Sequence, residues 1–340
     1  MVKGCTVLKY FLLCAVFITA LCLQIAPAAA FGGKKDEGAL EQAVIEHGGY
    51  QRIYWIYDPR SGKERAAAGK RPLILALHGG GGKAEKFHTS FGDATSMRTL
   101  ADREDVLIVY PQGYKRQWND GRGVDQIPAQ KLQMDDIGFL SALIDLMIAN
   151  RDADPLRVYA TGISNGGFMS NRAACELSKK IAAVGIVTAG MPIRLAPLCK
   201  PEAPVAVLIM NGTQDPFCPF NGGMVGRKKK PRGEMMSTLD SFYFWLKQAG
   251  YKEAAPLIRP KALPDKDKTD DTRVFKQSFR GDAGQEVMLY TVEGGGHTWP
   301  GGKQYLPKFL IGKVNRDIDG INEIWDFFAR NPKKAIKKKD

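Results

Sequence analysis

Short apolar runs alternate along the chain with longer segments in which apolar residues recur every three or four positions. The short runs predict buried strands at residues 53–57, 73–77, 106–110, 158–161, 183–188, 205–210 and 287–292. The segments with helical spacing predict helices at residues 136–149, 165–178, 236–248 and 321–329.

This alternation of strands and helices predicts an α/β fold, in which a mostly parallel sheet is covered by helices on both faces. The carboxyl ends of parallel strands meet at one edge of such a sheet, and ligands bind outside that edge. We therefore expect any catalytic side chains in the loops that directly follow strands. No internal repeat or long low-complexity linker interrupts the pattern.

The first thirty residues have a different pattern. Lys3 and Lys9 give a positive start, residues 10–25 are almost wholly apolar, and Pro27 precedes three alanines that end at Ala30. This layout is typical of a secretory signal peptide cleaved after Ala30. A retained membrane anchor is the alternative, but the apolar run is shorter than the ~20 residues that span a bilayer.

A lipoprotein signal at Cys22 is a weaker alternative, because Leu21 stands where such a signal needs a small residue. We expect residues 1–30 to be removed, residues 31–331 to form one α/β domain and residues 332–340 to be a basic, disordered tail. The mature protein would be secreted, to the periplasm or the extracellular medium, without membrane attachment.

Three cysteines remain after removal of the signal, namely Cys175, Cys199 and Cys218. In the oxidising environment of an exported protein two of them can pair, which leaves one over. Their spacing contains no C-x-x-C pair, so the sequence predicts no zinc site.

The chain carries a formal net charge of +13, and the basic excess is concentrated in two segments. One is residues 227–232, and the other is the tail with Lys333, Lys334 and residues 337–339. Such segments either contact an anionic polymer or surface, or are a solvated loop and a frayed terminus. Neither has interleaved aromatic residues or a nucleic-acid-binding motif, so nucleic acid is not a predicted partner.

The strongest chemical signal is Gly162-Ile163-Ser164-Asn165-Gly166, which follows the strand at 158–161 and opens the helix at 165–178. This is the G-x-S-x-G pattern of a nucleophile elbow in its required strand–turn–helix context. The two glycines let neighbouring backbone approach closely, so the hydroxyl of Ser164 stands at the tip of a tight turn. The alternative is an ordinary serine cap at a helix start. We predict Ser164 as a catalytic nucleophile.

A serine hydroxyl needs a base to take its proton. The chain has four histidines, and only His297 lies in a glycine-rich segment directly after a predicted strand. His47 precedes the first predicted strand, His78 begins a glycine loop where a structural role is expected, and His88 has no supporting motif. We predict His297 as the general base, against the alternative that it packs beside Trp299.

The base in turn needs an acid that fixes its tautomer. Asp215 follows the strand at 205–210, which gives the chain order Ser, Asp, His that is expected for α/β-hydrolases. Asp135 and Asp136 are competing carboxylates, but their place before a helix favours capping. We predict Asp215 as the acid.

A glycine run after the strand at 73–77, His78-Gly79-Gly80-Gly81-Gly82, can turn backbone N–H groups toward a developing negative oxygen. We predict Gly80 or Gly81 as one donor of an oxyanion hole. The amide of Asn165, the residue after the nucleophile, is the expected second donor. The alternative is a simple flexible loop.

Together these motifs resemble the secreted polyhydroxybutyrate depolymerase and feruloyl esterase group of the α/β-hydrolase superfamily. The resemblance extends over about residues 50–328 and is far more specific than the elbow alone. It rests on residues 77–82, 110–113, 118–120, 135–139, 154–159, 162–167, 211–215 and 297–302.

The resemblance implies Ser164, Asp215 and His297 as a catalytic triad. It also implies a disulfide between Cys175 and Cys199, with Cys218 left free. Members of the group cleave esters of short hydroxy acids, hydroxycinnamates or acetylated sugars. No separate polymer-binding domain is recognisable and residues 227–232 look like an insertion, and both features argue against a crystalline polymer as substrate.

The sequence thus predicts a secreted serine carboxylic-ester hydrolase that acts through an acyl-enzyme on short hydroxyacyl esters or polyester oligomers, with no metal or organic cofactor. A feruloyl or acetyl-xylan esterase is the alternative. A non-catalytic secreted binding protein that uses residues 227–232 is a third hypothesis. Trp118 and Trp299 are candidates to line the substrate cleft, against plain packing in the core.

Overall fold

A ten-stranded sheet runs through the part of the chain that the computed structural model describes, which is residues 40–61, 69–89, 96–227, 230–252 and 258–334. In spatial order its strands are β1 (Glu41–His47), β2 (Tyr50–Tyr57), β4 (Leu107–Pro111), β3 (Arg71–Leu77), β5 (Ala153–Ile163), β6 (Ala183–Val187), β7 (Ala206–Gly212), β12 (Glu286–Glu293), β11 (Arg273–Arg280) and β10 (Lys261–Ala262).

The middle of the sheet is parallel. Every neighbouring pair from β4 through β3, β5, β6 and β7 to β12 runs in the same direction. Antiparallel strands close both edges, with β1 and β2 beside β4 and with β11 and β10 beside β12. The carboxyl ends of the parallel strands therefore share one edge, and the predicted α/β fold is confirmed.

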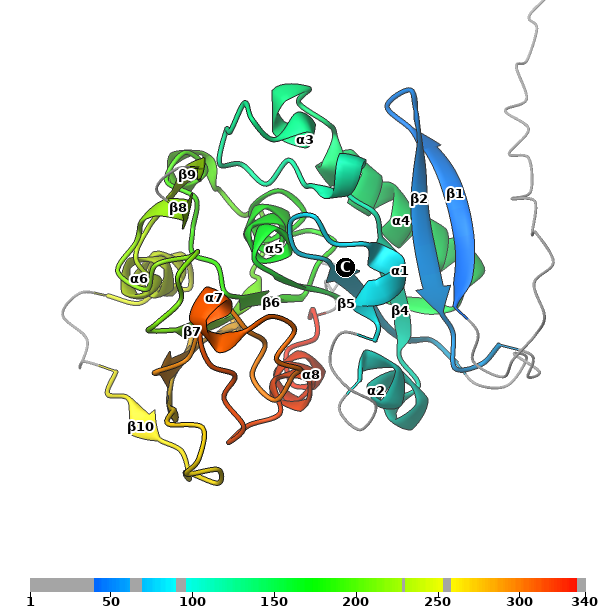
Figure 1. The fold of residues 1–340 in the computed structure, drawn as a ribbon. Coiled ribbons are helices and arrows are strands. Elements are labelled where there is room, and N and C mark those ends of the chain that lie inside the picture. Colours follow the sequence, from blue (N-terminus) through cyan, green and yellow to red (C-terminus); the bar gives the residue numbers. More distant parts are fainter. Residues whose placement is uncertain (1–39, 62–68, 90–95, 228–229, 253–257, 335–340) are drawn as a thin grey trace, which may run out of the picture. The chain divides into compact units, whose positions relative to one another are not determined.

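Helices cover both faces of the sheet (Figure 1). On one face lie α4 (Asp136–Asn150), α5 (Asn165–Glu176) and α6 (Thr238–Gln248), and on the other lie α2 (Met97–Glu104) and α8 (Gly320–Ala329). Shorter helices lie in the connections, namely α1 (Ala84–Phe87), η1 (Tyr114–Arg116), α3 (Pro128–Lys131), η2 (Ala196–Leu198) and α7 (Lys308–Ile311).

Strand β3 shows how the two faces build two cores. Leu73, Leu75 and Leu77 point into the core with α4, α5 and α6, whereas Ile74 and Ala76 point into the core with α2 and α8. Because both faces are covered, all seven residues of β3 are buried, which explains its uninterrupted apolar run.

The outer strands β1, β10 and β11 are among the elements that apolar periodicity did not predict. β1 reads Glu-Gln-Ala-Val-Ile-Glu-His and is half exposed, so it lacks the apolar run of a buried strand. A two-residue turn at Gly48 and Gly49, with φ angles of 60° and 78°, joins it to β2. Such positive φ angles suit the primed turns of hairpins, and Gly-Gly is a sequence signal for them.

The basic segment 227–232 lies in a hairpin rather than in an unstructured loop. Strands β8 (Gly223–Arg227) and β9 (Lys230–Met235) pair antiparallel as a separate two-stranded sheet. Residues 228–229, between the two strands, lie outside the described part of the chain. The cations flanking them thus sit on hydrogen-bonded strands.

The described residues extend to residue 334, past the predicted domain end at residue 331. The backbone N–H of Lys333 donates to the carbonyl of Leu156, 2.8 Å away, and its ammonium donates to the carbonyl of Ser178. Residues 335–340 and the predicted signal peptide at 1–30 lie outside the described residues. The described residues all belong to one unit that spans residues 32–340, and none of their helices is long and apolar enough to cross a membrane.

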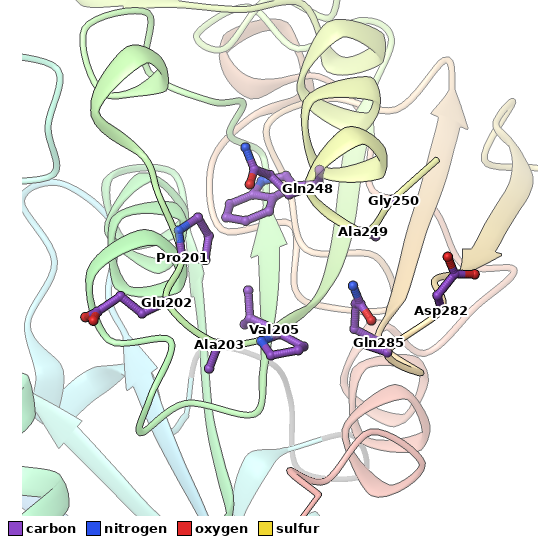
Figure 2. Close-up of a pocket in the computed structure, with 12 residues that line it drawn as sticks. Pro201, Glu202, Ala203, Val205, Gln248, Ala249, Gly250, Asp282 and Gln285 are labelled. Carbon is purple, nitrogen blue, oxygen red and sulfur yellow. The ribbon is translucent and has the colours of Figure 1, made fainter. Parts of the chain in front are cut away.

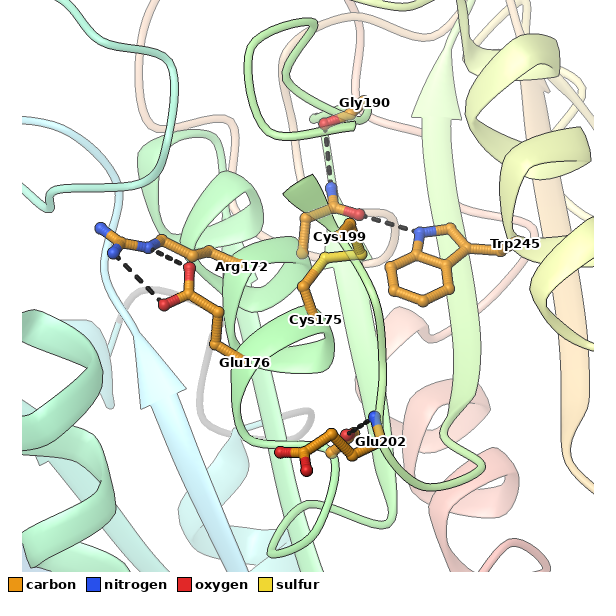
Figure 3. The surroundings of a disulfide bond; sticks show 9 residues. Arg172, Cys175, Glu176, Gly190, Cys199, Glu202 and Trp245 are labelled. Carbon is orange, nitrogen blue, oxygen red and sulfur yellow. Dashed lines mark hydrogen bonds and ion pairs between the residues drawn. A yellow bond between two sulfur atoms is a disulfide. The ribbon is translucent and has the colours of Figure 1, made fainter. Parts of the chain in front are cut away.

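A disulfide joins Cys175, in the last turn of α5, to Cys199, directly after η2 (Figure 3). This is the pair that the resemblance implies, and Cys218 is free and buried. Asn171 supports the same region, because its amide donates to Gly190 and accepts from the indole of Trp245. The bond therefore closes a loop that runs from the end of α5 through strand β6 to the residue after η2.

The disulfide should stabilise the protein mainly by restricting the unfolded chain. The bonded cysteines are 24 residues apart, and a loop of that length corresponds to about 3 kcal/mol of unfolding free energy. We expect the double variant Cys175→Ala/Cys199→Ala to lose about this amount in urea unfolding at neutral pH.

Reductant should lower the stability of the wild type to that of the double variant and should leave the double variant unchanged. Cys218→Ala is the matched control, because it removes a thiol without opening a loop, and its stability should still fall on reduction. Equal unfolding free energies for the oxidised wild type and the double variant would contradict this role.

Candidate active site

The predicted catalytic residues all follow strands of the parallel part of the sheet. Ser164 directly follows β5, Asp215 follows β7 and His297 follows β12, while the glycine run begins after β3. Since these strands are parallel, their carboxyl ends lie at the same edge, and the four segments converge there.

Ser164 occupies the strained turn between β5 and α5. Its φ is 56° and its ψ is −120°, a conformation that residues with a side chain rarely adopt. The backbone N–H of Ser164 donates to the carbonyl of Val187 at 2.9 Å and to the hydroxyl of Thr188 at 3.1 Å. Its own side chain makes no capping hydrogen bond to α5. The hydroxyl is thus not used as a helix cap.

The turn leaves no space for side chains at the glycines of the motif. A β-carbon on Gly166 would lie 2.1 Å from the carbonyl oxygen of Leu77, and one on Gly162 would lie 2.6 Å from the backbone of Gly166. The elbow therefore packs directly on the end of β3. This close approach brings the glycine run beside Ser164, whose Cβ is 3.7 Å from the β-carbon position of Gly79.

Asp215 and His297 form a buried pair. Oδ2 of Asp215 lies 2.7 Å from Nδ1 of His297, and the two side chains are 1% and 8% exposed. The other carboxylate oxygen accepts the backbone N–H groups of Phe217 and Cys218 at 2.8 and 2.9 Å. An ionised carboxylate only accepts, so Nδ1 of His297 carries the proton and Nε2 has its lone pair free.

Two aromatic side chains hold the imidazole of His297 in place. The ring of Phe217 packs 5.2 Å from it, and the hydroxyl of Tyr305 donates to its backbone carbonyl at 2.9 Å. Within the described part of the chain no hydrogen bond joins His297 to the hydroxyl of Ser164. Such bonds are often long in the absence of substrate and tighten when it binds.

His78 is a structural residue of the glycine run. Its Nδ1 lies 2.7 Å from the carbonyl of Gly79, and its Nε2 accepts from the N–H of Gly113 at 3.0 Å. A carbonyl cannot donate and a backbone N–H cannot accept, so His78 is neutral with its proton on Nδ1. Burial, with a smaller effect of the nearby Arg116, lowers the pKa of His78 to about 4.

The structure separates the two glycines that were predicted as oxyanion donors. The N–H of Gly81 donates to the carbonyl of Arg116 at 2.8 Å, so Gly81 is already occupied, which corrects that alternative. The N–H of Gly80 makes no hydrogen bond to any described residue. Asn165 is the first residue of α5, so its N–H has no partner within the helix. Gly80 and Asn165 are the donors that remain available.

A buried carboxylate that sequence reasoning did not single out, Asp120, holds the second donor in place. Its oxygens accept from the amide of Asn165 at 2.5 Å, from Gln130 at 2.9 Å and from the guanidinium of Arg122. The side chain of Asn165 also accepts the backbone N–H of Trp118 at 2.8 Å. The motif Trp118-Asn119-Asp120 contributes to the resemblance, but only the fold shows that it anchors the elbow.

The two tryptophans are core residues and do not line a cleft. Trp118 is fully buried, and its indole N–H donates to the carbonyl of His78 at 2.9 Å. Trp299 is 3% exposed and packs in the core with α2 and α8. The expectation that they contact substrate is therefore wrong for these buried positions. Their aromatic rings support the glycine run and the segment after His297 from inside.

The competing carboxylates have structural roles. Asp135 is the cap of α4 and accepts the N–H of Gly138 at 2.8 Å, as the sequence predicts. Asp136 is fully buried and pairs with Arg52 at 2.5 Å, so its role is an ion pair rather than a cap. The hydrogen bond from His47 to Asp135, at 2.8 Å, ties the end of β1 to the same helix.

Cys218 lies close to Asp215 and His297. Asp215, Cys218 and His297 each place one potential metal ligand within 4.8 Å of the others. Burial raises the pKa of the Cys218 thiol well above its ordinary value, so the thiol stays protonated and is a poor ligand. The facing atoms of Asp215 and His297 are already bonded to each other. Asp215, Cys218 and His297 are therefore a poor set of ligands for a metal ion.

A cavity of about 360 Å³ lies away from these residues (Figure 2). It is lined by residues 201–205 before β7, by the end of α6 and by residues 282–285 before β12. These segments lie at the amino ends of the strands, so the length of β7, about 23 Å for seven residues, separates the cavity from Asp215. It takes no part in the chemistry described above.

The curated proteins that are similar to this chain include the following two esterases. One is a protein named as an esterase, NocK of Nocardia uniformis subsp. tsuyamanensis, which is 31% identical to this chain over 265 residues. The aligned region covers 76% of this chain and 74% of that protein. The other is feruloyl esterase B of Piromyces equi, which is 27% identical to this chain over 238 residues. The aligned region covers 68% of this chain and 40% of that longer protein. No protein-family model matches the chain.

A solved structure has a similar fold. The acetyl xylan esterase from Aspergillus awamori superposes with a TM-score of 0.56, covering 86% of this chain and 100% of that one. The two sequences are 14% identical, so this likeness concerns the fold alone.

The neutral His78 predicts a loss of stability in acid. In the unfolded chain a histidine binds a proton near pH 6.5, whereas His78 in the fold does so only near pH 4. The neutral His78 therefore contributes fully to stability above pH 6.5, and this contribution is lost as pH falls toward 4. At pH 4 the free energy of unfolding is lower by about 3 kcal/mol for this reason. Urea unfolding of the wild type and His78→Gln at pH 7 and pH 4 measures this difference.

We expect the unfolding free energy of the wild type to fall by about 3 kcal/mol more than that of His78→Gln over this range. Glutamine retains an amide donor and acceptor but does not titrate. His47→Gln, which changes a half-buried histidine at the end of β1, serves as the control and should keep the additional acid sensitivity. Parallel pH profiles for the wild type and His78→Gln would show that the fold does not hold His78 neutral.

Proposed function

The chain belongs to the esterases of the α/β-hydrolase superfamily and is a carboxylic-ester hydrolase, and from this premise we propose that Ser164, Asp215 and His297 form its catalytic triad. The observation that carries the proposal is the 2.7 Å contact between Asp215 and His297, at the strand edge where Ser164 occupies a strained turn. The contact leaves Nε2 of His297 free to accept a proton, which is the property a general base needs.

In the proposed mechanism His297 takes the hydroxyl proton of Ser164 while the serine oxygen attacks the ester carbonyl. The negative oxygen of the tetrahedral intermediate accepts the N–H groups of Gly80 and Asn165. The protonated His297 then gives its proton to the departing alcohol, and an acyl-enzyme remains. Water attacks that ester with His297 again as base, which releases the acid and restores Ser164.

The groups around the triad support these roles. Two backbone N–H groups donate to the carboxylate of Asp215 and hold it in place, so that it can stabilise the imidazolium of His297 as the proton arrives. Removal of one oxyanion donor typically costs about 3 kcal/mol of transition-state stabilisation. Asp120 supports that donor set because it binds the side chain of Asn165.

For the substrate, we propose esters of short hydroxy acids or polyester oligomers. A feruloyl or acetyl-xylan esterase is the second candidate, and the relative from Piromyces equi, named as a feruloyl esterase, favours it. The two candidates share one mechanism and differ in the acyl group. Rates on a hydroxybutyrate oligomer, methyl ferulate and 4-nitrophenyl acetate separate them, with the highest kcat/KM on the oligomer under the first proposal.

Export of the protein through a signal peptide at residues 1–30 is part of the proposal. The disulfide between Cys175 and Cys199 supports it, because such bonds persist in oxidising compartments. We expect the mature protein, recovered from the periplasm or the culture medium of an expressing cell, to begin at Phe31. N-terminal sequencing checks this, and a protein retained in the cytoplasm with Met1 or Val2 at its start would refute it.

Loss of the nucleophile should abolish the activity without unfolding the protein. We expect Ser164→Ala to lower kcat on 4-nitrophenyl acetate by about 10⁴- to 10⁶-fold, and Asp215→Asn by about 10⁴-fold through the wrong tautomer of His297. Labelling with a fluorophosphonate should mark the wild type and not Ser164→Ala.

The control is Ser141→Ala on α4, whose hydroxyl contacts Lys180 away from the strand edge, and it should be labelled like the wild type. Equal labelling of Ser164→Ala, or no labelling of the wild type, would overturn the triad. Salt-sensitive binding to an anionic polymer by a protein without esterase activity would instead support the binding protein that uses residues 227–232.

A further inference from the structure

The hairpin β8–β9 carries a cluster of exposed cations. Arg227 ends β8, and Lys230 and Arg232 lie on β9, all three exposed, with Glu234 as the acidic residue on the same strand. Segments of this kind are often only solvated surface. The hydrogen bonds of both strands show that this hairpin is instead fixed beside the proposed triad.

The first strand is tied to the base. The N–H of Gly226 donates to the carbonyl of Phe217 at 2.7 Å, and the guanidinium of Arg227 lies over the Phe217 ring, 5.3 Å from its centre. The other neighbour of that ring is His297, 5.2 Å away. Arg227 therefore lies one aromatic ring away from the proposed general base.

The second strand is tied to the oxyanion donors. The carbonyl of Arg232 accepts from Arg122 at 2.8 Å, and Arg122 is the partner of Asp120, which binds Asn165. Nη1 of Arg232 lies 3.4 Å from the position that a β-carbon on Gly80 would take. The guanidinium of Arg232 thus lies directly against the glycine run.

Two further cations lie beside the glycine run, and together with Arg227 and Arg232 they form a group that we call the basic border. Lys115 and Arg116 are exposed, and the carbonyl of Arg116 accepts the N–H of Gly81. Among the described residues, no carboxylate lies within ion-pair distance of Arg116, Arg227 or Arg232. Two buried carboxylates of the proposed site are occupied, Asp215 by His297 and Asp120 by Arg122. The border is therefore a region of uncompensated positive charge.

We infer that Arg227 and Arg232 bind a carboxylate of the substrate, so that the site selects esters with a negative charge close to the scissile bond. The inference rests on the proposed function, because it places that carboxylate in relation to Ser164. A guanidinium offers paired donors that match a carboxylate, and uncompensated charges at the entrance also draw an anion toward the site.

A matched pair of substrates tests this selectivity. The 4-nitrophenyl half ester of adipic acid and 4-nitrophenyl hexanoate have acyl chains of equal length and the same leaving group, and only the first carries a carboxylate. We expect the wild type to prefer the charged ester. In Arg227→Gln/Arg232→Gln the ratio of the two kcat/KM values should fall about tenfold, mainly through KM, the equivalent of one charge-assisted hydrogen bond.

Salt and a distant arginine provide the controls. Added NaCl should lower the wild-type ratio, because exposed charges are screened, and should change that of the double variant less. Arg259→Gln removes an exposed arginine before β10, toward the amino ends of the parallel strands, and should keep the wild-type ratio. A ratio that the double variant leaves unchanged would overturn the inference while the esterase activity itself stands.

Binding separates this inference from the mechanism. Titration of Ser164→Ala with monomethyl adipate and with methyl hexanoate measures recognition alone. If neither 4-nitrophenyl ester is hydrolysed, the proposed function fails, and charge-dependent binding that is lost in the arginine variants still supports the inference. Equal binding of both ligands overturns it.

A small acid ester and an acidic polysaccharide offer the same carboxylate. Release of acetate from acetylated polygalacturonate, compared with acetylated neutral xylan, distinguishes the two sources. Preference for the adipate half ester without preference for the acidic polymer identifies a small substrate. Preference for both identifies a polymer that runs along the hairpin.

Discussion

The close contact between the elbow and the end of β3 is the constraint on which the site depends. With the β-carbon position of Gly166 only 2.1 Å from the carbonyl of Leu77, α5 must begin against the neighbouring strand. That approach forces Ser164 into a positive φ and frees its hydroxyl from capping the helix. It also brings the glycine run beside Ser164, at whose carboxyl side α5 begins. Backbone proximity, rather than a side-chain contact, thus organises the proposed nucleophile and the two proposed oxyanion donors.

A second layer of buried polar groups holds this arrangement. His78 holds the glycine run in place, because one ring nitrogen donates to the carbonyl of Gly79 and the other accepts the N–H of Gly113. Asp120 does the same for the elbow through Asn165. Both side chains are buried, so each would be costly without its full set of partners. The geometry of the proposed site is therefore supported by buried groups outside the proposed triad.

The same layer links the active site to the basic hairpin. Asp120 binds Arg122, and Arg122 binds the backbone of Arg232, while Phe217 packs between Arg227 and His297. The hairpin is thus joined to the oxyanion side through hydrogen bonds and to the base side through ring packing. A segment that looks like an insertion in the sequence becomes part of the wall of the site. The role that we propose for its charges rests on this position and not on their composition.

Much of this was readable from the chain itself. The apolar runs of the buried strands, the glycine-flanked Ser164 and the order of Ser164, Asp215 and His297 predicted the parallel sheet and one edge for the chemistry, because burial on both faces demands continuous apolar strands. The edge strand β1 was not predicted, because apolar and polar residues alternate only weakly along this half-exposed strand.

The tertiary structure decided what depends on partners distant in sequence. It occupied Gly81 with the carbonyl of Arg116, buried Trp118 and Trp299 in the cores, and gave Asp120 its role beside Asn165. Hydrogen bonding and burial are properties of neighbours in space, and a motif names only neighbours along the chain. The residue types of the site were therefore set by the sequence, while the free donors, the proton position on His297 and the location of the cations were set by the fold.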